Sequence, residues 1–105
     1  MTPVVVLTTV SADFDLGALA SDLIEQHLAA CVNIIGGVRS IYRWQGKIED
    51  DREQLAIIKT VSERVAELRD ALFARHPYDV PEFVVLPIDR IEGPYRQWLI
   101  DCVTG

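Results

Sequence analysis

The feature that most constrains the fold is a hairpin signal in the middle of the chain. Gln45 and Gly46 connect two runs of strand-forming residues, and Gly46 supplies the positive φ that a tight primed turn requires. Both arms carry several charged residues near the turn. The first arm has Arg39 and Arg43, and the second arm has Glu49, Asp50, Asp51 and Glu53. Because neither face is clean enough to cover a monomer's core, we expect the hairpin to reach beyond its own sheet towards another chain.

The length and charge of the chain limit the classes of protein to consider. With 105 residues, residues 1–105 form a single domain with one hydrophobic core. The formal charge of −6 and the pI near 4.7 argue against a nucleic-acid partner, since phosphate groups are neutralised by clustered Lys and Arg. The same charge favours cations as small ligands.

The N-terminal residues and the cysteine content indicate a cytoplasmic protein. Met1-Thr2-Pro3 carries no basic residue, and the following apolar run, Val4–Leu7, is too short for a signal peptide or a membrane span. Two cysteines, Cys31 and Cys102, are too few for a disulfide framework and suit a reducing compartment. We therefore expect no membrane partner.

The first half of the chain predicts a strand, a helix and a second strand. Val4–Leu7 is a short apolar run with β-branched residues, which is typical of a central strand buried on both faces. Ser11-Ala12-Asp13 can cap an amphipathic helix that ends near Ala29 or Ala30. Cys31–Ile35 resumes strand character, and Gly36-Gly37 indicates a bulge before the hairpin arm.

The second half repeats this order. The returning arm ends in Leu55–Thr60, a second candidate for a central strand. Ser62 is expected to cap a second helix, and His76-Pro77 ends it because proline lacks the N–H donor and restricts the residue before it. Glu82–Ile88 is the fourth strand, and Gly93-Pro94 opens a short final helix.

This order, β-α-β-β-α-β with a C-terminal helix, predicts an α+β fold of the ferredoxin-like, split βαβ type. Such a fold has an antiparallel sheet covered on one face by two helices. Apolar positions alternate onto both faces of these strands, so a partner subunit is expected to cover the second face.

Several local sequences resemble those of the CutA family: Leu28–Asn33, Ser40–Ile48, Ile58–Thr60, His76–Tyr78 and Pro81-Glu82. The specific elements are Tyr-x-Trp-x-Gly-Lys and His-Pro-Tyr-x-x-Pro-Glu, and the match covers nearly the whole chain. The resemblance implies a tight homotrimer held by strand pairing between subunits. It also implies a role in tolerance of divalent cations such as copper, and likeness to the trimeric PII-type proteins, which bind small ligands in clefts between subunits.

One departure from the family pattern concerns metal binding. Family members with proposed copper ligands carry a cysteine at the end of the first strand and two histidines before Pro-Tyr. Here those positions are Thr8, Arg75 and His76. A single imidazole beside a cationic arginine predicts at most weak binding of Cu²⁺.

The residues expected to line a cleft between subunits combine aromatic, charged and soft side chains: Cys31, Tyr42, Trp44, Lys59, His76, Tyr78, Glu82 and Trp98. Interface packing also explains the aromatic members, and it is the favoured explanation for Trp44, next to the hairpin turn. Lys59 is the charged residue of an apolar strand, and it either pairs with Glu82 or a hairpin carboxylate or meets an anionic ligand.

His76 is the candidate metal ligand, and its sequence context allows a metal-binding role or a structural role. Together with Asp79 and Glu82 it could form a nitrogen-and-oxygen site. It could instead be a helix-end histidine that meets the last carbonyls, with the loop carboxylates capping backbone donors.

No catalytic motif accompanies these residues. The chain lacks a Gly-x-Ser-x-Gly elbow, a phosphate loop and a helical pair of histidines, so we expect no enzyme and infer no organic cofactor. Two functions remain. One is a trimeric CutA-type protein that responds to divalent metal ions by weak metal binding or through a cleft ligand. The other is a PII-like small-molecule sensor or trimeric assembly scaffold without a physiological metal.

Overall fold

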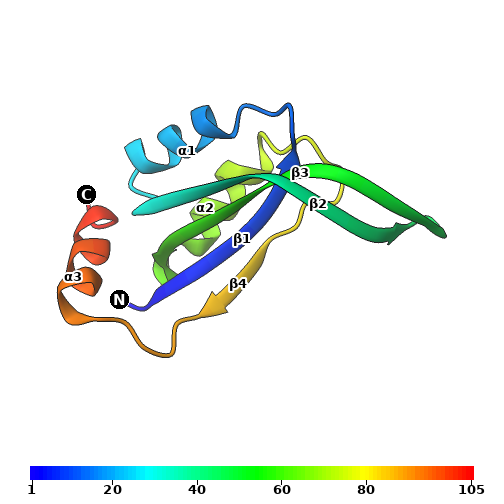
Figure 1. The fold of residues 1–105 in the computed structure, drawn as a ribbon. Coiled ribbons are helices and arrows are strands. Elements are labelled where there is room, and N and C mark those ends of the chain that lie inside the picture. The colour runs from blue at the N-terminus through cyan, green and yellow to red at the C-terminus, as the bar shows by residue number, and fades with distance from the viewer.

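The computed structural model describes all residues, 1–105. It contains a four-stranded sheet, three α-helices and one short 3-10 turn (Figure 1). The elements in chain order are β1 (Pro3–Ser11), α1 (Leu16–Glu25), β2 (Cys31–Trp44), β3 (Lys47–Val61), η1 (Ser62–Arg64), α2 (Val65–Phe73), β4 (Val84–Pro87) and α3 (Gly93–Cys102).

The sheet is antiparallel, with strand order β2-β3-β1-β4. The two apolar runs predicted to be central, Val4–Leu7 and Leu55–Thr60, lie in β1 and β3, the two inner strands. The prediction of an α+β fold with an antiparallel sheet is therefore confirmed. β1 is longer than predicted, because Thr8–Ser11 stay paired with β3.

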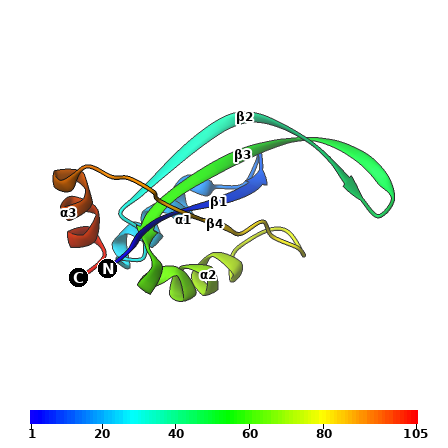
Figure 2. The same cartoon turned by 90° about the horizontal axis from the view of Figure 1, so that it is seen from below.

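The β2-β3 hairpin extends past the rest of the sheet, as predicted. β1 pairs with β3 only as far as Glu53, so the residues of β3 before Glu53 pair with β2 alone. Figure 2 shows this two-stranded arm projecting from the body of the molecule, which measures 44 × 27 × 23 Å.

The backbone angles of the hairpin account for its turn and for its bulge. Gln45 and Gly46 have φ values of 50° and 79°, the positive angles that a primed two-residue turn needs at both central positions. The register of β2 against β3 shifts between Ile35 and Val38, and Gly37 has a φ of 71° there. The bulge predicted at Gly36-Gly37 is confirmed.

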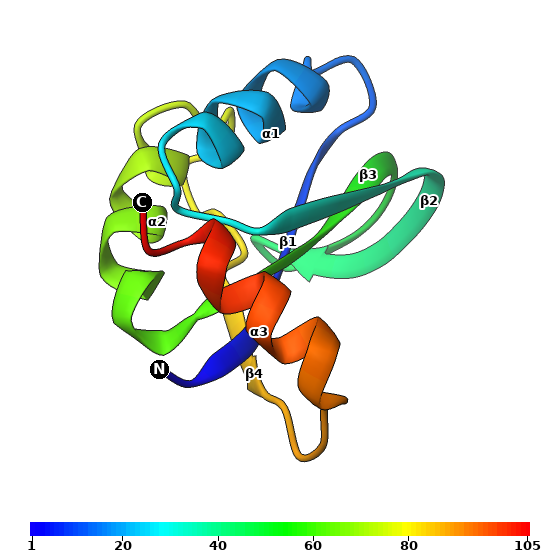
Figure 3. The same cartoon turned by 90° about the vertical axis from the view of Figure 1, so that its left-hand side faces the viewer.

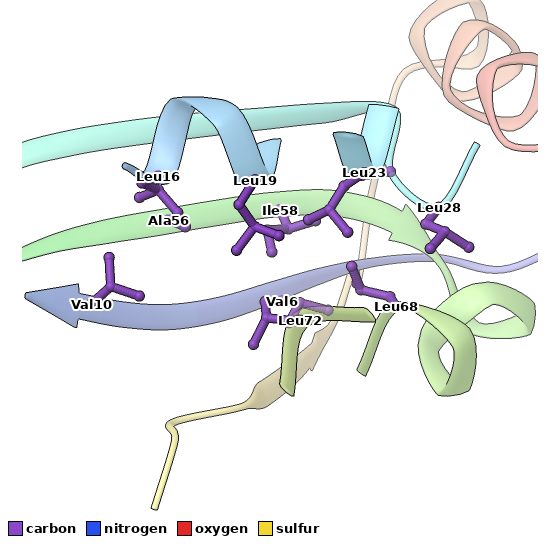
Figure 4. Packing of buried hydrophobic residues seen from close by; sticks show 11 residues of the cluster. Val6, Val10, Leu16, Leu19, Leu23, Leu28, Ala56, Ile58, Leu68 and Leu72 are labelled. Atoms are coloured by element: carbon purple, nitrogen blue, oxygen red, sulfur yellow. The ribbon is translucent and has the colours of Figure 1, made fainter. Parts of the chain in front are cut away.

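The core lies between one face of the sheet and the two helices α1 and α2 (Figures 3 and 4). Leucines of both helices meet alternate residues of the inner strands, and all of these side chains are buried: Val6, Val10, Leu16, Leu19, Leu23, Leu28, Ala56, Ile58, Leu68 and Leu72. A smaller buried cluster packs α3 against the end of the sheet that lies away from the hairpin turn (Figure 1): Ala30, Val61, Leu99 and Val103.

The predicted end of the first helix was wrong. α1 ends at Glu25, well before Ala29 and Ala30, because His27 takes a left-handed φ of 58°. The ring Nδ1 of His27 lies 3.1 Å from the carbonyl oxygen of Cys102. His27 is therefore outside the helix that the sequence assigned to it. The helix cap is Asp15, whose side chain accepts a hydrogen bond from the Ala18 N–H, and not Ser11–Asp13.

Three further boundaries differ from the prediction. Ser62 opens the turn η1 and not α2. α2 ends at Phe73, before His76-Pro77. β4 spans only Val84–Pro87, within the predicted Glu82–Ile88.

The two edge strands of the sheet are incompletely covered within the chain. Large apolar side chains remain exposed on both edge strands, including Ile34, Ile35 and Ile41 of β2 and Val84, Val85 and Leu86 of β4. Exposed apolar side chains along unpaired strand edges are typical of a surface that another chain covers.

Candidate functional site

A cavity lies at the base of the projecting hairpin. Its volume is about 560 Å³. Side chains from the hairpin arms, the end of β1 and the loop between α2 and β4 line it: Thr9, Ser40, Tyr42, Trp44, Asp51, Glu53, Pro77, Tyr78, Asp79, Val80 and Glu82. The lining contains four carboxylates, three aromatic rings and no Lys, Arg or His.

Glu53 is the most buried of the four carboxylates. It is 5 % exposed, and the hydroxyl of Tyr78 donates a hydrogen bond of 2.6 Å to its Oε2 atom. Burial is the larger cause and this hydrogen bond the second cause of a raised pKa of Tyr78, so the phenol keeps its proton at neutral pH. Burial and the nearby charge of Glu53 also raise the pKa of Glu82.

Tyr42 forms a similar pair further along the arm. Its hydroxyl donates to the Oδ2 atom of Asp51, and this hydrogen bond is the main reason that the pKa of Tyr42 rises to about 12. Both tyrosines therefore stay neutral with their hydroxyls held by carboxylates. Trp44 completes the aromatic part of the lining and is 43 % exposed.

His76 lies beside the cavity, with both ring nitrogens in hydrogen bonds. The N–H of Tyr78 donates to Nδ1 at 3.1 Å, which places the ring proton on Nε2. Nε2 lies 3.0 Å from the carbonyl oxygen of Thr9 and 3.3 Å from the hydroxyl of Thr8. Burial lowers the pKa of His76, so the ring is neutral at pH 7.

These contacts replace the interpretation of His76 as a helix-end residue. Its ring meets the end of β1, not the last carbonyls of α2. The structure also shows where the two residues that differ from the family pattern lie. Thr8 lies next to His76, whereas Arg75 turns away and forms an ion pair of 2.5 Å with Asp22 of α1.

A compact metal site is absent from the single chain. No group of three His, Cys, Asp or Glu side chains lies close enough to hold a metal ion. His76, Asp79 and Glu82 therefore do not form the nitrogen-and-oxygen site considered from the sequence. His76 could accept a metal only by giving up the hydrogen bond from the Tyr78 N–H.

The other predicted cleft residues lie at the opposite end of the sheet. Cys31 is the register partner of Lys59, and the Nζ atom of Lys59 lies 5.8 Å from the ring centre of Tyr95. Tyr95 in turn packs on Trp98, with ring centres 5.3 Å apart. Lys59 pairs with neither Glu82 nor a hairpin carboxylate. The first of its two alternatives was therefore wrong, and contact with an anionic ligand stays a prediction.

The structure thus divides the predicted cleft residues into two groups. Tyr42, Trp44, Tyr78 and Glu82 line the cavity, with His76 beside it. Cys31, Lys59 and Trp98 do not. Sequence reasoning missed Glu53, Asp51 and Thr9 as lining residues. Glu53 stood among four similar acidic residues, and only its pairing with Tyr78 distinguishes it.

Taken together, the molecule is a small α+β protein with a long two-stranded arm and an acidic, aromatic-lined cavity where that arm joins the sheet. The sequence model of the family described as "CutA1 divalent ion tolerance protein" matches residues 4–102. Since this match covers nearly the whole chain, the protein belongs to the CutA1 divalent ion tolerance family.

Individual relatives agree. The chain is 45% identical over 95 residues to the "Divalent-cation tolerance protein CutA" of Thermus thermophilus, covering 90% of this chain and 92% of that protein. It is 47% identical over 81 residues to the human "Protein CutA", covering 77% of this chain and 45% of that longer protein. The crystal structure of CutA1 from Oryza sativa superposes with a TM-score of 0.92 at 40% identity, covering 97% of this chain and 94% of that one.

These comparisons bear on the general class of function. The descriptions of the family and of the Thermus thermophilus relative concern tolerance of divalent cations. No helix of this protein combines the length and the apolar character needed to cross a membrane.

Proposed function

We propose that this protein acts in tolerance of divalent cations as a homotrimer of ferredoxin-like subunits that binds such a cation weakly in the acidic cavity. The observation that carries the proposal is the charge of the cavity lining. Asp51, Glu53, Asp79 and Glu82 contribute four carboxylates, and no basic side chain offsets them. Carboxylate oxygens are ligands for hard divalent cations.

The same geometry explains why the binding is expected to be weak. Tight sites need several ligands converging on the ion, and no three candidate side chains converge in this chain. A cation held between separated carboxylates keeps most of its water. Cu²⁺ is the ion that the family resemblance suggests, and His76 remains a predicted ligand for it.

The trimer is supported by the apolar residues on the edge strands and by the projecting hairpin. Partner subunits would cover Val84, Val85 and Leu86 on one edge and Ile34 and Ile35 on the other. In such an assembly the group of Cys31, Lys59 and Trp98 would belong to the wall of a cleft between subunits. Catalysis is not part of the proposal, and the two free cysteines support a cytoplasmic location.

Calorimetric titration tests the metal part. Metal-stripped protein is titrated with Cu²⁺ and Zn²⁺ and compared with Asp79→Asn, His76→Ala and Cys31→Ser. We expect affinity in the micromolar range or weaker, reduced by Asp79→Asn and unchanged by Cys31→Ser. Loss of binding in His76→Ala alone would place the ion on the imidazole, and nanomolar affinity unaffected by all three changes would contradict the proposal.

The second candidate is the PII-like sensor or assembly scaffold that contacts no metal. It is favoured by one observation, the volume of about 560 Å³, which suits a small organic molecule better than a bare ion. Mass measurement in solution tests both candidates, because each requires a trimer at micromolar concentration. A folded monomer would contradict both.

A further inference from the structure

The wall of the cavity contains a carboxylate with which no basic side chain of the chain pairs. Glu53 is 5 % exposed, yet it takes part in none of the ion pairs of the chain. Its Oε2 atom accepts the hydrogen bond from Tyr78. Its Oε1 atom accepts no hydrogen bond and remains accessible, since no fully buried side-chain oxygen of the chain lacks a partner. Burial of a carboxylate is costly unless a cation accompanies it. The chain therefore supplies Glu53 with one hydrogen-bond donor and with no cation.

The neighbouring carboxylates add to the same field. Asp79 and Glu82 also line the cavity, and neither forms an ion pair or a side-chain hydrogen bond within the chain. Burial is the larger cause of the raised pKa of Glu82, and repulsion from the charge of Glu53 adds to it. A positive group placed between them would relieve that repulsion.

The aromatic side chains distinguish an organic cation from a metal ion. Tyr42, Trp44 and Tyr78 all line the cavity, and aromatic faces attract ammonium groups through their quadrupoles. The hydroxyls of Tyr42 and Tyr78 are tied to carboxylates, which fixes the two rings. A volume of about 560 Å³ accommodates an alkyl stem as well as a charged head.

We propose that this cavity binds a small organic cation of the alkylammonium class, with the ammonium group at Glu53 and the apolar stem against Tyr42, Trp44 and Tyr78. The inference uses the same cavity as the proposed function and does not depend on metal binding. Its failure would leave the copper titration untouched, and a failed copper titration would not affect it.

Calorimetry of the whole protein with three probes of equal chain length provides the test. Butane-1,4-diamine is a cation, butane-1,4-diol is neutral and succinate is an anion. We expect the diamine to bind with one site per chain, and the diol and succinate to give no measurable heat of binding. Binding of the diol as tight as that of the diamine, or tighter binding of succinate, would overturn the proposal.

Variants locate the site. Glu53→Gln keeps the size of the side chain and removes its charge, and it should weaken diamine binding by about tenfold or more. Glu25→Gln makes the same charge change at an exposed position on α1 and should leave binding unchanged. If Glu53→Gln does not fold, Trp44→Ala on the exposed arm serves instead and should also weaken binding. Equal affinity in wild type and in the cavity variants would refute the assignment.

Discussion

The hydrogen bond between Tyr78 and Glu53 offers the sharpest test of the cavity's architecture. Tyr78→Phe removes only the hydroxyl group that donates a hydrogen bond of 2.6 Å to the Oε2 atom of Glu53. A hydrogen bond to a charged group contributes roughly 1.5–3 kcal/mol. Because Tyr78 is half-buried and water can partly replace its hydroxyl, we expect the variant to lose about 1–2 kcal/mol of unfolding free energy.

The measurement is urea-induced unfolding at one fixed protein concentration, since the stability of an oligomer depends on concentration. Tyr95→Phe is the matched control, because Tyr95 is exposed on α3 and its hydroxyl makes no hydrogen bond within the chain. In a Glu53→Gln background, Tyr78→Phe should cost less than in wild type, since the charged acceptor is gone. A loss no larger than that of Tyr95→Phe would refute the reasoning that the phenol stabilises a buried charge.

Three further predictions concern the fold. Leu68→Ala should lose about 2–5 kcal/mol in urea unfolding, since Leu68 is fully buried between α2 and the sheet, and a smaller loss would show that the core collapses around the gap. Gly46→Val should lose about 1–2 kcal/mol in the same assay, because Gly46 has a φ of 79° and a side chain opposes that conformation; an unchanged midpoint would contradict the primed turn. The pKa of His76 is lowered in the folded protein, so the fold disfavours the protonated ring and wild type should lose stability as the pH falls below about 6.5 towards that lowered pKa. The loss of stability due to His76 should be absent in His76→Phe, and equal pH profiles of unfolding free energy for the two proteins would contradict the prediction.

Features that depend on neighbouring residues were predictable from the sequence. The Gln45-Gly46 turn and the bulge at Gly36-Gly37 follow from backbone preferences at the residues themselves. The inner strands follow from continuous apolar runs, which only a strand with neighbours on both sides can bury. The family was recognisable for the same reason, since its motifs are short and local.

Features that depend on distant contacts were not predictable in this way. Apolar periodicity continues through Leu28, Ala29 and Ala30, and all three are buried, so the pattern alone could not show that the helix stops earlier. His27, just past the end of the helix, contacts the carbonyl oxygen of Cys102, which lies 75 residues away along the chain. Periodicity reports burial and does not distinguish a buried loop from a buried helix.

The candidate site shows the same division. Sequence reasoning selected Tyr42, Trp44 and Tyr78 from their chemistry, and the structure brings them to one cavity. It also grouped Lys59 with them, because a lysine in an apolar strand needs a partner for its charge. The structure places the Lys59 ammonium near the ring of Tyr95, a cation–π contact between residues far apart in the sequence that no local pattern indicates.

The most direct test of the central claim, that the acidic cavity is the site where cations bind, is the broadening of backbone amide NMR signals by Mn²⁺. This paramagnetic divalent cation broadens the signals of residues near its binding site. The cavity proposal predicts that the amides of Tyr78, Asp79 and Glu82 lose intensity first, at Mn²⁺ concentrations well below that of the protein. Loss of intensity first at Cys31 and Lys59, or uniform loss across the surface, would contradict it.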